Sequence, residues 1–201
     1  MLRIENLRKA FGGVVATSDV SIHFPKESLS AVIGPNGAGK TTFFNLISGA
    51  IRPDAGNIYL DGENIVGLSG NDIVRKGIGR AFQVAKLFKS LTVEESLRGA
   101  LLSPLGRSAQ MSGRFPLPET RDRAYEVMDQ LGLTPKANVI SGNLSHGDQK
   151  LLDMALALVL KPKVLLLDEP VAGMGPEERE QMIETVHALW KKGGLTVVLI
   201  E

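Results

Sequence analysis

The stretch from Ser28 to Gly49, SLSAVIGPNGAGKTTFFNLISG, constrains the fold of this chain more than any other. Its apolar run Leu29 to Ile33 predicts a short buried strand, and the apolar segment Thr42 to Ile47, closed by Ser48-Gly49, predicts a helix. Between them lies GPNGAGKT, which fits the phosphate-loop pattern G-x-x-x-x-G-K-[ST] in the strand–loop–helix context that the pattern requires. We therefore expect an α/β fold that binds a nucleotide.

The residue types in this loop suit phosphate binding. Glycines allow the backbone to turn its N–H groups inward around phosphate oxygens, and the helix that starts near Gly39 adds the positive end of its dipole. Lys40 supplies a charge for the outer phosphates, and the Thr41 hydroxyl is placed to bind Mg²⁺. The alternative is a glycine-rich turn without a ligand. The predicted nucleotide-binding residues of the loop are Gly34, Pro35, Asn36, Gly37, Ala38, Gly39, Lys40, Thr41 and Thr42.

Composition excludes several classes of protein. A chain of 201 residues suits one domain, or one domain with a subdomain. Its 23 basic and 22 acidic residues nearly balance, so the chain has no overall positive electrostatic field that would attract nucleic acid. The absence of cysteine excludes disulfides and thiolate metal sites. No apolar signal core begins the chain, and no uncharged apolar run approaches ~18 residues. We expect a soluble or peripheral protein whose membrane role, if any, comes from a partner.

The order of predicted elements indicates an α/β core with a helical insert. Strands are predicted at Met1 to Leu7, Val14 to Phe24, Asn57 to Leu60 and Ile78 to Phe82. Next come a helix at Val93 to Leu102 with a Thr92–Glu95 capping box, a loop at Ser103 to Pro118, and a helix at Arg121 to Leu131. We therefore predict a nucleotide-binding core at 1–83 and 161–201, a helical subdomain at 84–160, and an antiparallel β region near the N-terminus.

The α/β pattern returns near the C-terminus. Val164 to Leu167 is typical of a parallel strand covered on both faces, and Thr196 to Ile200 predicts a second buried strand. Between them, Glu177 to Trp190 predicts a helix with one apolar face. That face comprises Met182, Ile183, Val186, Leu189 and Trp190.

Two carboxylates, Asp168 and Glu169, follow the strand at Val164 to Leu167. Ligands of open α/β sheets lie at the carboxyl ends of the strands, so Asp168 is suited to hold Mg²⁺ through water and Glu169 to polarise the water that attacks the γ-phosphate. Gln83, at the end of a short strand, could reach both the metal and that water. The alternative for the two carboxylates is that they cap the next turn. The alternative for Gln83 is a position on the surface without a role.

The segment LSHGDQK opens a helix predicted at Lys150 to Leu160. Ser145 as N-cap with Asp148 at the third helical position forms a capping box. The same helix end, with Ser145 and Gly147, could present N–H groups to a phosphate. The two roles are compatible, and the residues alone do not decide between them.

GPNGAGKT, Gln83, LSHGDQK and VLLLDEP, in this order and spacing, resemble the ATP-binding cassette (ABC) ATPases over essentially the whole chain. The resemblance implies a P-loop NTPase core of the RecA type, ATP and Mg²⁺ as ligands, and a head-to-tail dimer with two ATP molecules at its interface. Ser145 and Gly147 of one subunit would then act on the nucleotide of the other. Phe11 matches the position of the aromatic residue that stacks on adenine in this family. The alternative is that Phe11 is a residue of the core.

The segments GRAFQVAKLFKSLTVEES and EPVAGMGPEE resemble the ATPase subunits of bacterial importers for branched-chain amino acids, amides or urea. That resemblance implies a homodimer or a heterodimer with a second ABC ATPase, on the cytoplasmic face of the inner membrane. Its partners would be integral membrane permease subunits, and indirectly a periplasmic or extracellular solute-binding protein, with no nucleic acid. An exposed Leu87-Phe88 pair would suit the contact with the permease.

Three departures from the family pattern stand out. Gly175 stands where many relatives carry an aspartate that helps communication across the dimer. His146 replaces a glycine and could titrate beside the phosphates, or lie exposed without a role. Relatives carry a histidine just after a glutamate that matches Glu201, where this chain ends. Either the chain is a fragment that is missing the C-terminal part of the family domain, or it lacks the residue that contacts the γ-phosphate and orients the water. We therefore expect this chain to bind Mg-ATP but to hydrolyse it poorly. The alternatives to a transport ATPase are a soluble cassette that acts on nucleic acid or the ribosome, and a regulatory nucleotide-binding module without turnover.

Overall fold

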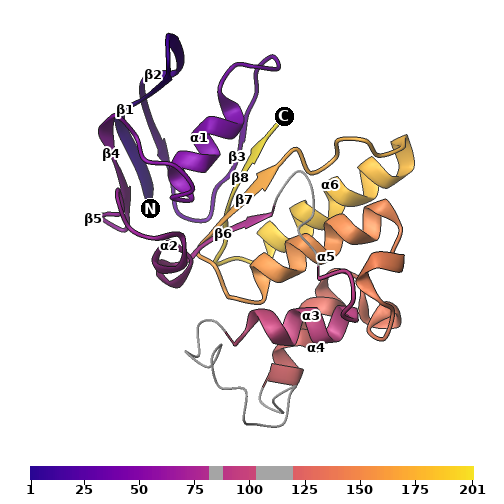
Figure 1. The fold of residues 1–201 in the computed structure, drawn as a ribbon. Helices are drawn as coiled ribbons and strands as arrows, with labels where there is room; N and C mark the ends of the chain where they lie inside the picture. Colours follow the sequence, from indigo (N-terminus) through magenta and orange to yellow (C-terminus); the bar gives the residue numbers. More distant parts are fainter. Residues whose placement is uncertain (82–87, 103–119) are drawn as a thin grey trace. The chain divides into compact units, whose positions relative to one another are not determined.

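The computed structural model describes residues 1–81, 88–102 and 120–201, and these form two compact units (Figure 1). The first unit comprises Met1–Arg80, Pro162–Glu169 and Trp190–Glu201. The second comprises the described residues of Ala81–Lys161 and Pro170–Leu189. The predicted loop at Ser103 to Pro118 lies outside the described residues.

The first unit contains the predicted antiparallel β region. Its strands are β1 (Leu2–Phe11), β2 (Val14–Phe24), β4 (Ala55–Leu60) and β5 (Glu63–Asn64), in the order β2-β1-β4-β5. Leu2 of β1 lies opposite both Phe24 of β2 and Leu60 of β4, and all three side chains are buried. Apolar residues at matching register positions thus give this sheet one face that packs into the core.

The second sheet of this unit carries the carboxyl ends that matter for function. Its strands are β3 (Leu29–Val32), β6 (Ile78–Ala81), β7 (Val164–Asp168) and β8 (Thr196–Ile200), in the order β3-β8-β7-β6. β3, β8 and β7 run parallel to one another. Every residue of β7 is buried, which confirms a strand covered on both faces.

The prediction that the first parallel strand is buried was wrong. β3 ends at Val32, its side chains are half-buried or exposed, and Ile33 just beyond it is 80% exposed. The reason is its position, because β3 is at the edge of the described sheet and has a strand neighbour on one side only.

Helix α1 (Lys40–Ile47) lies between the two sheets in Figure 1, and α2 (Gly70–Lys76) completes the helices of the first unit. Phe43, Phe44, Leu46 and Ile47 of α1 belong to one buried cluster with apolar residues of both sheets. The helix that follows the phosphate loop is therefore held on both sides by the core.

The helices assigned mainly to the second unit, with its 3₁₀ turns, are α3 (Val93–Ala100), α4 (Arg121–Gln130), η2 (Thr134–Lys136), η3 (Ser141–Asn143), α5 (His146–Leu158) and α6 (Pro176–Lys191). The predicted capping box of α3 is present, since Thr92 and Glu95 each accept the other's backbone N–H. α5 begins at His146, four residues earlier than predicted, because Ser145 caps it. None of the described helices is both long and apolar enough to cross a bilayer.

One predicted member of the apolar face of α6 was wrong. Met182, Val186 and Leu189 are buried, whereas Ile183 is 56% exposed. The buried residues recur at intervals of four and three, and Ile183 is rotated by about 100° from that stripe.

Candidate functional site

The loop between β3 and α1 has the backbone geometry expected of a phosphate loop. Gly37 and Gly39 have φ angles of 82° and 87°, in the left-handed region that favours glycine. The Ala38 N–H donates to the Pro35 carbonyl at 3.2 Å, which tightens the turn, and α1 starts at Lys40. No side chain in the described part of the chain caps this helix, so its N-terminal N–H groups remain for an anion.

Gly39 is required by space as well as by its φ angle. A Cβ atom on Gly39 would lie 2.0 Å from the carbonyl oxygen of Ala16 in β2. Only glycine therefore allows the loop to pass so close to this strand.

Lys40 is buried and its ammonium group lies against the loop itself. The Nζ donates to the carbonyl oxygens of Gly34 and Pro35, at 2.5 and 3.0 Å. These two bonds hold the positive charge inside the loop's curve. A cleft of about 230 Å³ opens beside it, lined by residues of the loop and of β2 that include Ala16, Ser18, Gly34 and Ala38.

The two predicted carboxylates lie at the carboxyl ends of the parallel strands, as does the phosphate loop. Val32 of β3, Ile200 of β8 and Asp168 of β7 are in register across three neighbouring strands. Glu169 follows directly, with a φ angle of 50°, and its N–H donates to the Ile200 carbonyl at 3.1 Å. The structure thus brings the phosphate loop, Asp168 and Glu169 together at the carboxyl ends of the strands, where ligands of α/β proteins bind.

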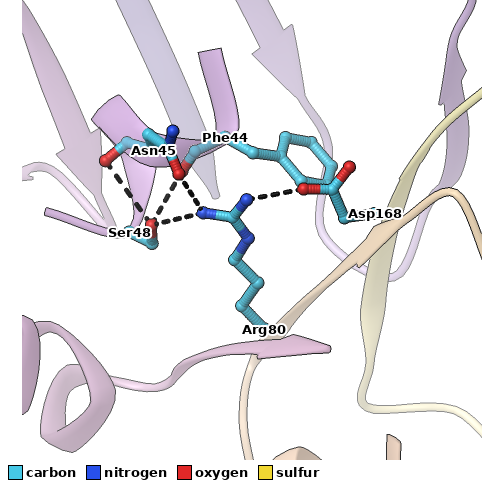
Figure 2. Close-up of polar contacts among 5 residues, drawn as sticks. All are labelled: Phe44, Asn45, Ser48, Arg80 and Asp168. Carbon is cyan, nitrogen blue, oxygen red and sulfur yellow. Dashed lines mark hydrogen bonds and ion pairs between the residues drawn. The ribbon is translucent and has the colours of Figure 1, made fainter. Parts of the chain in front are cut away.

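Arg80 near the end of β6 is a site residue that sequence reasoning missed (Figure 2). Its guanidinium donates to Asp168 Oδ2 at 2.6 Å, to Asn45 Oδ1 at 2.7 Å and to Ser48 Oγ at 3.1 Å. The signal that could have found it is an arginine inside the short strand IGRA, because a buried charge needs a partner.

The residues present fit Mg²⁺ bound together with a nucleotide. Asp168 Oδ1 is buried and has no hydrogen-bond partner among the described residues, so it is an oxygen that a cation or its water could satisfy. The described residues hold no group of three or more His, Cys, Asp or Glu side chains that could hold a metal. Mg²⁺ commonly takes one or two carboxylates together with substrate phosphates, which matches this donor set.

Two predicted residues need separate mention. Gln83 lies outside the described residues. Phe11, at the end of β1, is 49% exposed and so is not a core residue. The Lys9 ammonium lies 5.4 Å from the centre of the Phe11 ring and donates a hydrogen bond to Asp54 Oδ1 at 2.7 Å. An exposed aromatic ring held in this way can stack on a base.

In the second unit, Ser145 and Gly147 lie at the start of α5. The Ser145 hydroxyl accepts the Asp148 N–H at 3.2 Å and donates to the Asp148 carboxylate at 2.6 Å, which confirms the predicted N-cap. Partial burial raises the pKa of Asp148, but hydrogen bonds from Lys136 and Ser145 outweigh it and leave the pKa below its ordinary value. His146 is exposed at this helix end.

Lys150 is a second residue without a predicted role. It is buried, and its ammonium donates to the carbonyl oxygens of Pro170 and Ala172 at 3.1 and 2.7 Å. These bonds tie the start of the segment after the carboxylates to α5.

Comparison with known proteins identifies the family. A family model described as ABC transporter matches residues 17–172, which is most of the chain. The chain belongs to the ABC transporter family. It is an ABC-type ATPase, and the phosphate loop and both carboxylates of this cassette lie within the matched range.

Relatives of this cassette match it over its whole length. It is 37% identical to a high-affinity branched-chain amino acid transport ATP-binding protein of Salmonella typhimurium, covering 100% of this chain and 81% of that protein. The protein of the same description from Pseudomonas aeruginosa is 38% identical over 208 residues. A probable branched-chain amino acid transport ATP-binding protein of Archaeoglobus fulgidus is 37% identical, covering all of this chain and 79% of its own.

Solved structures confirm the α/β cassette fold. A nucleotide-free ATP-binding cassette from an ABC transporter matches with a TM-score of 0.88 and 32% identity, covering 100% of this chain and 80% of its own. A cassette in its ADP conformation matches with a TM-score of 0.88 and 33% identity, with the same coverage. A dimeric cassette bound to ADP and Pi matches with a TM-score of 0.80 and 25% identity, covering 87% of that chain.

Proposed function

We propose that this cassette is the ATP-hydrolysing subunit of a bacterial importer for branched-chain amino acids or a similar small solute, such as an amide or urea. The observation that carries this proposal is the match, over the whole chain, to ATP-binding proteins of branched-chain amino acid transport. The geometry at the carboxyl ends of the strands supports the ATPase part of the proposal, because a phosphate loop and two carboxylates lie there together.

The phosphate loop binds ATP in this proposal. The N–H groups from Asn36 to Thr42 surround the phosphates, and Lys40 turns its ammonium from the Gly34 and Pro35 carbonyls toward the outer phosphates. Phe11 stacks on the adenine. The Thr41 hydroxyl, Asp168 and Gln83 would hold Mg²⁺, and the metal would neutralise negative charge on the phosphates.

Glu169 positions and polarises the attacking water. Its backbone is fixed beside Asp168 by the bond to the Ile200 carbonyl. A carboxylate held at the strand end can accept the water's proton as the water attacks the γ-phosphate. Asp168 would hold the metal and Glu169 would act on the water, so the two neighbouring carboxylates have different roles.

Dimer closure couples ATP to transport in this proposal. Ser145 and Gly147 act on the nucleotide of a second cassette, identical or related, through the N-terminus of α5. ATP contacts both subunits only in the closed dimer, so binding favours closure and loss of the γ-phosphate reverses it. A solved cassette with 25% identity to this chain is dimeric with ADP and Pi bound, which supports the dimer in this proposal.

Peripheral attachment to membrane permease subunits at the cytoplasmic face of the inner membrane completes the proposal. The second unit exposes Phe88, Val139 and Ile140. They lie near one another, because the Phe88 carbonyl accepts the Leu91 N–H and the Leu91 carbonyl accepts the Ser141 N–H. Exposed apolar side chains suit contact with a permease, and the formal net charge of +1 gives no support to a nucleic-acid partner.

Uptake by cells tests the proposed solute class. Cells in which this gene is deleted are expected to lose most high-affinity uptake of radiolabelled leucine, isoleucine and valine. The unaltered gene should restore uptake, and a Glu169→Gln version should not, because the water would lack its base. Uptake of an unrelated sugar serves as control. Unchanged uptake of all three amino acids, and of amides and urea, would contradict the proposed solute class.

A further inference from the structure

The guanidinium of Arg80 joins the carboxylate at the end of β7 to the end of α1 (Figure 2). One nitrogen bonds Asp168 Oδ2, and another bonds the side chains of Asn45 and Ser48. The carbon at the centre of the guanidinium lies 5.7 Å from the centre of the Phe44 ring. A single side chain therefore connects two elements that both contribute to the nucleotide site.

This ion pair is withdrawn from water. The side chains of Arg80 and Asp168 are 7% and 2% exposed. Taking two charges out of water is costly, and the cost is repaid only when the geometry is good and further hydrogen bonds satisfy the donors. Asn45 and Ser48 provide those further bonds. The arrangement is therefore specific to arginine, whose planar fork can serve two directions at once, whereas a lysine ammonium offers one point of charge.

The two oxygens of Asp168 have different surroundings. Arg80 occupies Oδ2, while Oδ1 is buried without a hydrogen-bond partner among the described residues. A carboxylate held at one oxygen cannot rotate freely, so the direction of the other oxygen is also fixed. The same guanidinium bonds Asn45 and Ser48 in and just after α1, the helix that begins with Lys40 and Thr41.

We propose that Arg80 is a positioning residue for the metal in this ATPase. It holds Asp168 by Oδ2 so that Oδ1 is presented to Mg²⁺, and it keeps Asp168 in register with the Thr41 hydroxyl through α1. This inference rests on the proposed function, in which Asp168 and Thr41 hold the metal. A merely structural ion pair would affect folding and leave metal affinity in the folded protein unchanged.

Metal affinity measured apart from ATP affinity tests this role. Mn²⁺, a paramagnetic substitute for Mg²⁺, is titrated into the ATP-bound protein and followed by electron paramagnetic resonance. Arg80→Met is expected to weaken Mn²⁺ binding about tenfold or more, as for other residues that orient a metal ligand. The affinity for ATP in EDTA should stay within about twofold, because the phosphate loop is intact. Arg75→Met, which removes an exposed arginine of α2 paired with Asp72, is the matched control and should change neither affinity.

Further variants separate the possible outcomes. Arg80→Lys retains the charge and should fold, and it is expected to weaken Mn²⁺ binding by a smaller factor, so it decides the matter if Arg80→Met does not fold. Wild-type Mn²⁺ affinity in the Arg80 variants, with weakened affinity in Asp168→Asn, would overturn this inference and leave the proposed function standing. Wild-type affinity in Asp168→Asn would instead overturn the metal role of Asp168, and this inference with it. An equal loss of ATP affinity in EDTA would also overturn the inference, since the effect would not concern the metal.

Discussion

Replacing Lys40 by alanine is expected to lower the affinity for ATP by about a hundredfold or more while the chain stays folded. Charge-assisted hydrogen bonds contribute about 1.5–3 kcal/mol each, and 1.4 kcal/mol corresponds to a factor of ten in affinity. The Lys40 ammonium lies inside the loop and can bond more than one phosphate oxygen. Isothermal titration calorimetry with ATP measures the loss directly.

The fold should survive this change for a structural reason. Lys40 begins α1, where alanine is a good helix former, and its bonds to Gly34 and Pro35 are to backbone carbonyls that water can reach once the side chain is shortened. Lys163→Ala is the matched control, because it removes a lysine of the same unit that pairs with Asp61 at the surface. ATP affinity of Lys40→Ala close to that of Lys163→Ala would refute the assigned role of the loop.

Replacing Gly39 by alanine is expected to destabilise the protein by about 2–4 kcal/mol, because left-handed backbone strain adds to a steric clash. The φ angle of Gly39 is 87°, and its Cβ would meet the Ala16 carbonyl oxygen at 2.0 Å. The backbone of the loop or of β2 must move to relieve this contact. Urea unfolding followed by circular dichroism measures the change, and ATP titration should show weaker binding.

Two other glycines provide graded controls. Gly37 has a φ angle of 82° but open space around its Cβ, so Gly37→Ala should cost only the left-handed strain of about 1–2 kcal/mol. Gly13 has neither a positive φ angle nor a neighbour within 4 Å, so Gly13→Ala should leave the stability nearly unchanged. If Gly39→Ala costs no more than Gly37→Ala, the close approach to β2 is not what requires glycine.

The elements and the phosphate loop could be predicted because their signals are local. The glycine spacing before Lys40, the four aliphatic residues before Asp168 and the Thr92–Glu95 capping box each lie within a few neighbouring residues. Short-range patterns of this kind fix turns, strands and helix ends directly. The structure confirms the capping box and the buried strand β7.

The parts that could not be predicted depend on contacts between distant residues. Arg80 and Asp168 are 88 positions apart, and only the strand order brings β6 beside β7. The exposure of β3 likewise follows from its place at the edge of the described sheet, which no local pattern encodes. Ile183 was misassigned because a helical face drawn from sequence is wider than the stripe that is buried.

Affinity purification from the native cell tests the transport role most directly. The tagged protein is isolated from gently solubilised membranes, and the proteins bound to it are identified by mass spectrometry. We expect two polytopic membrane proteins, with a second cassette ATPase if the dimer is a heterodimer. Recovery of ribosomes or nucleic-acid-binding proteins, with no permease from the membrane fraction, would contradict a role as the ATPase of an importer.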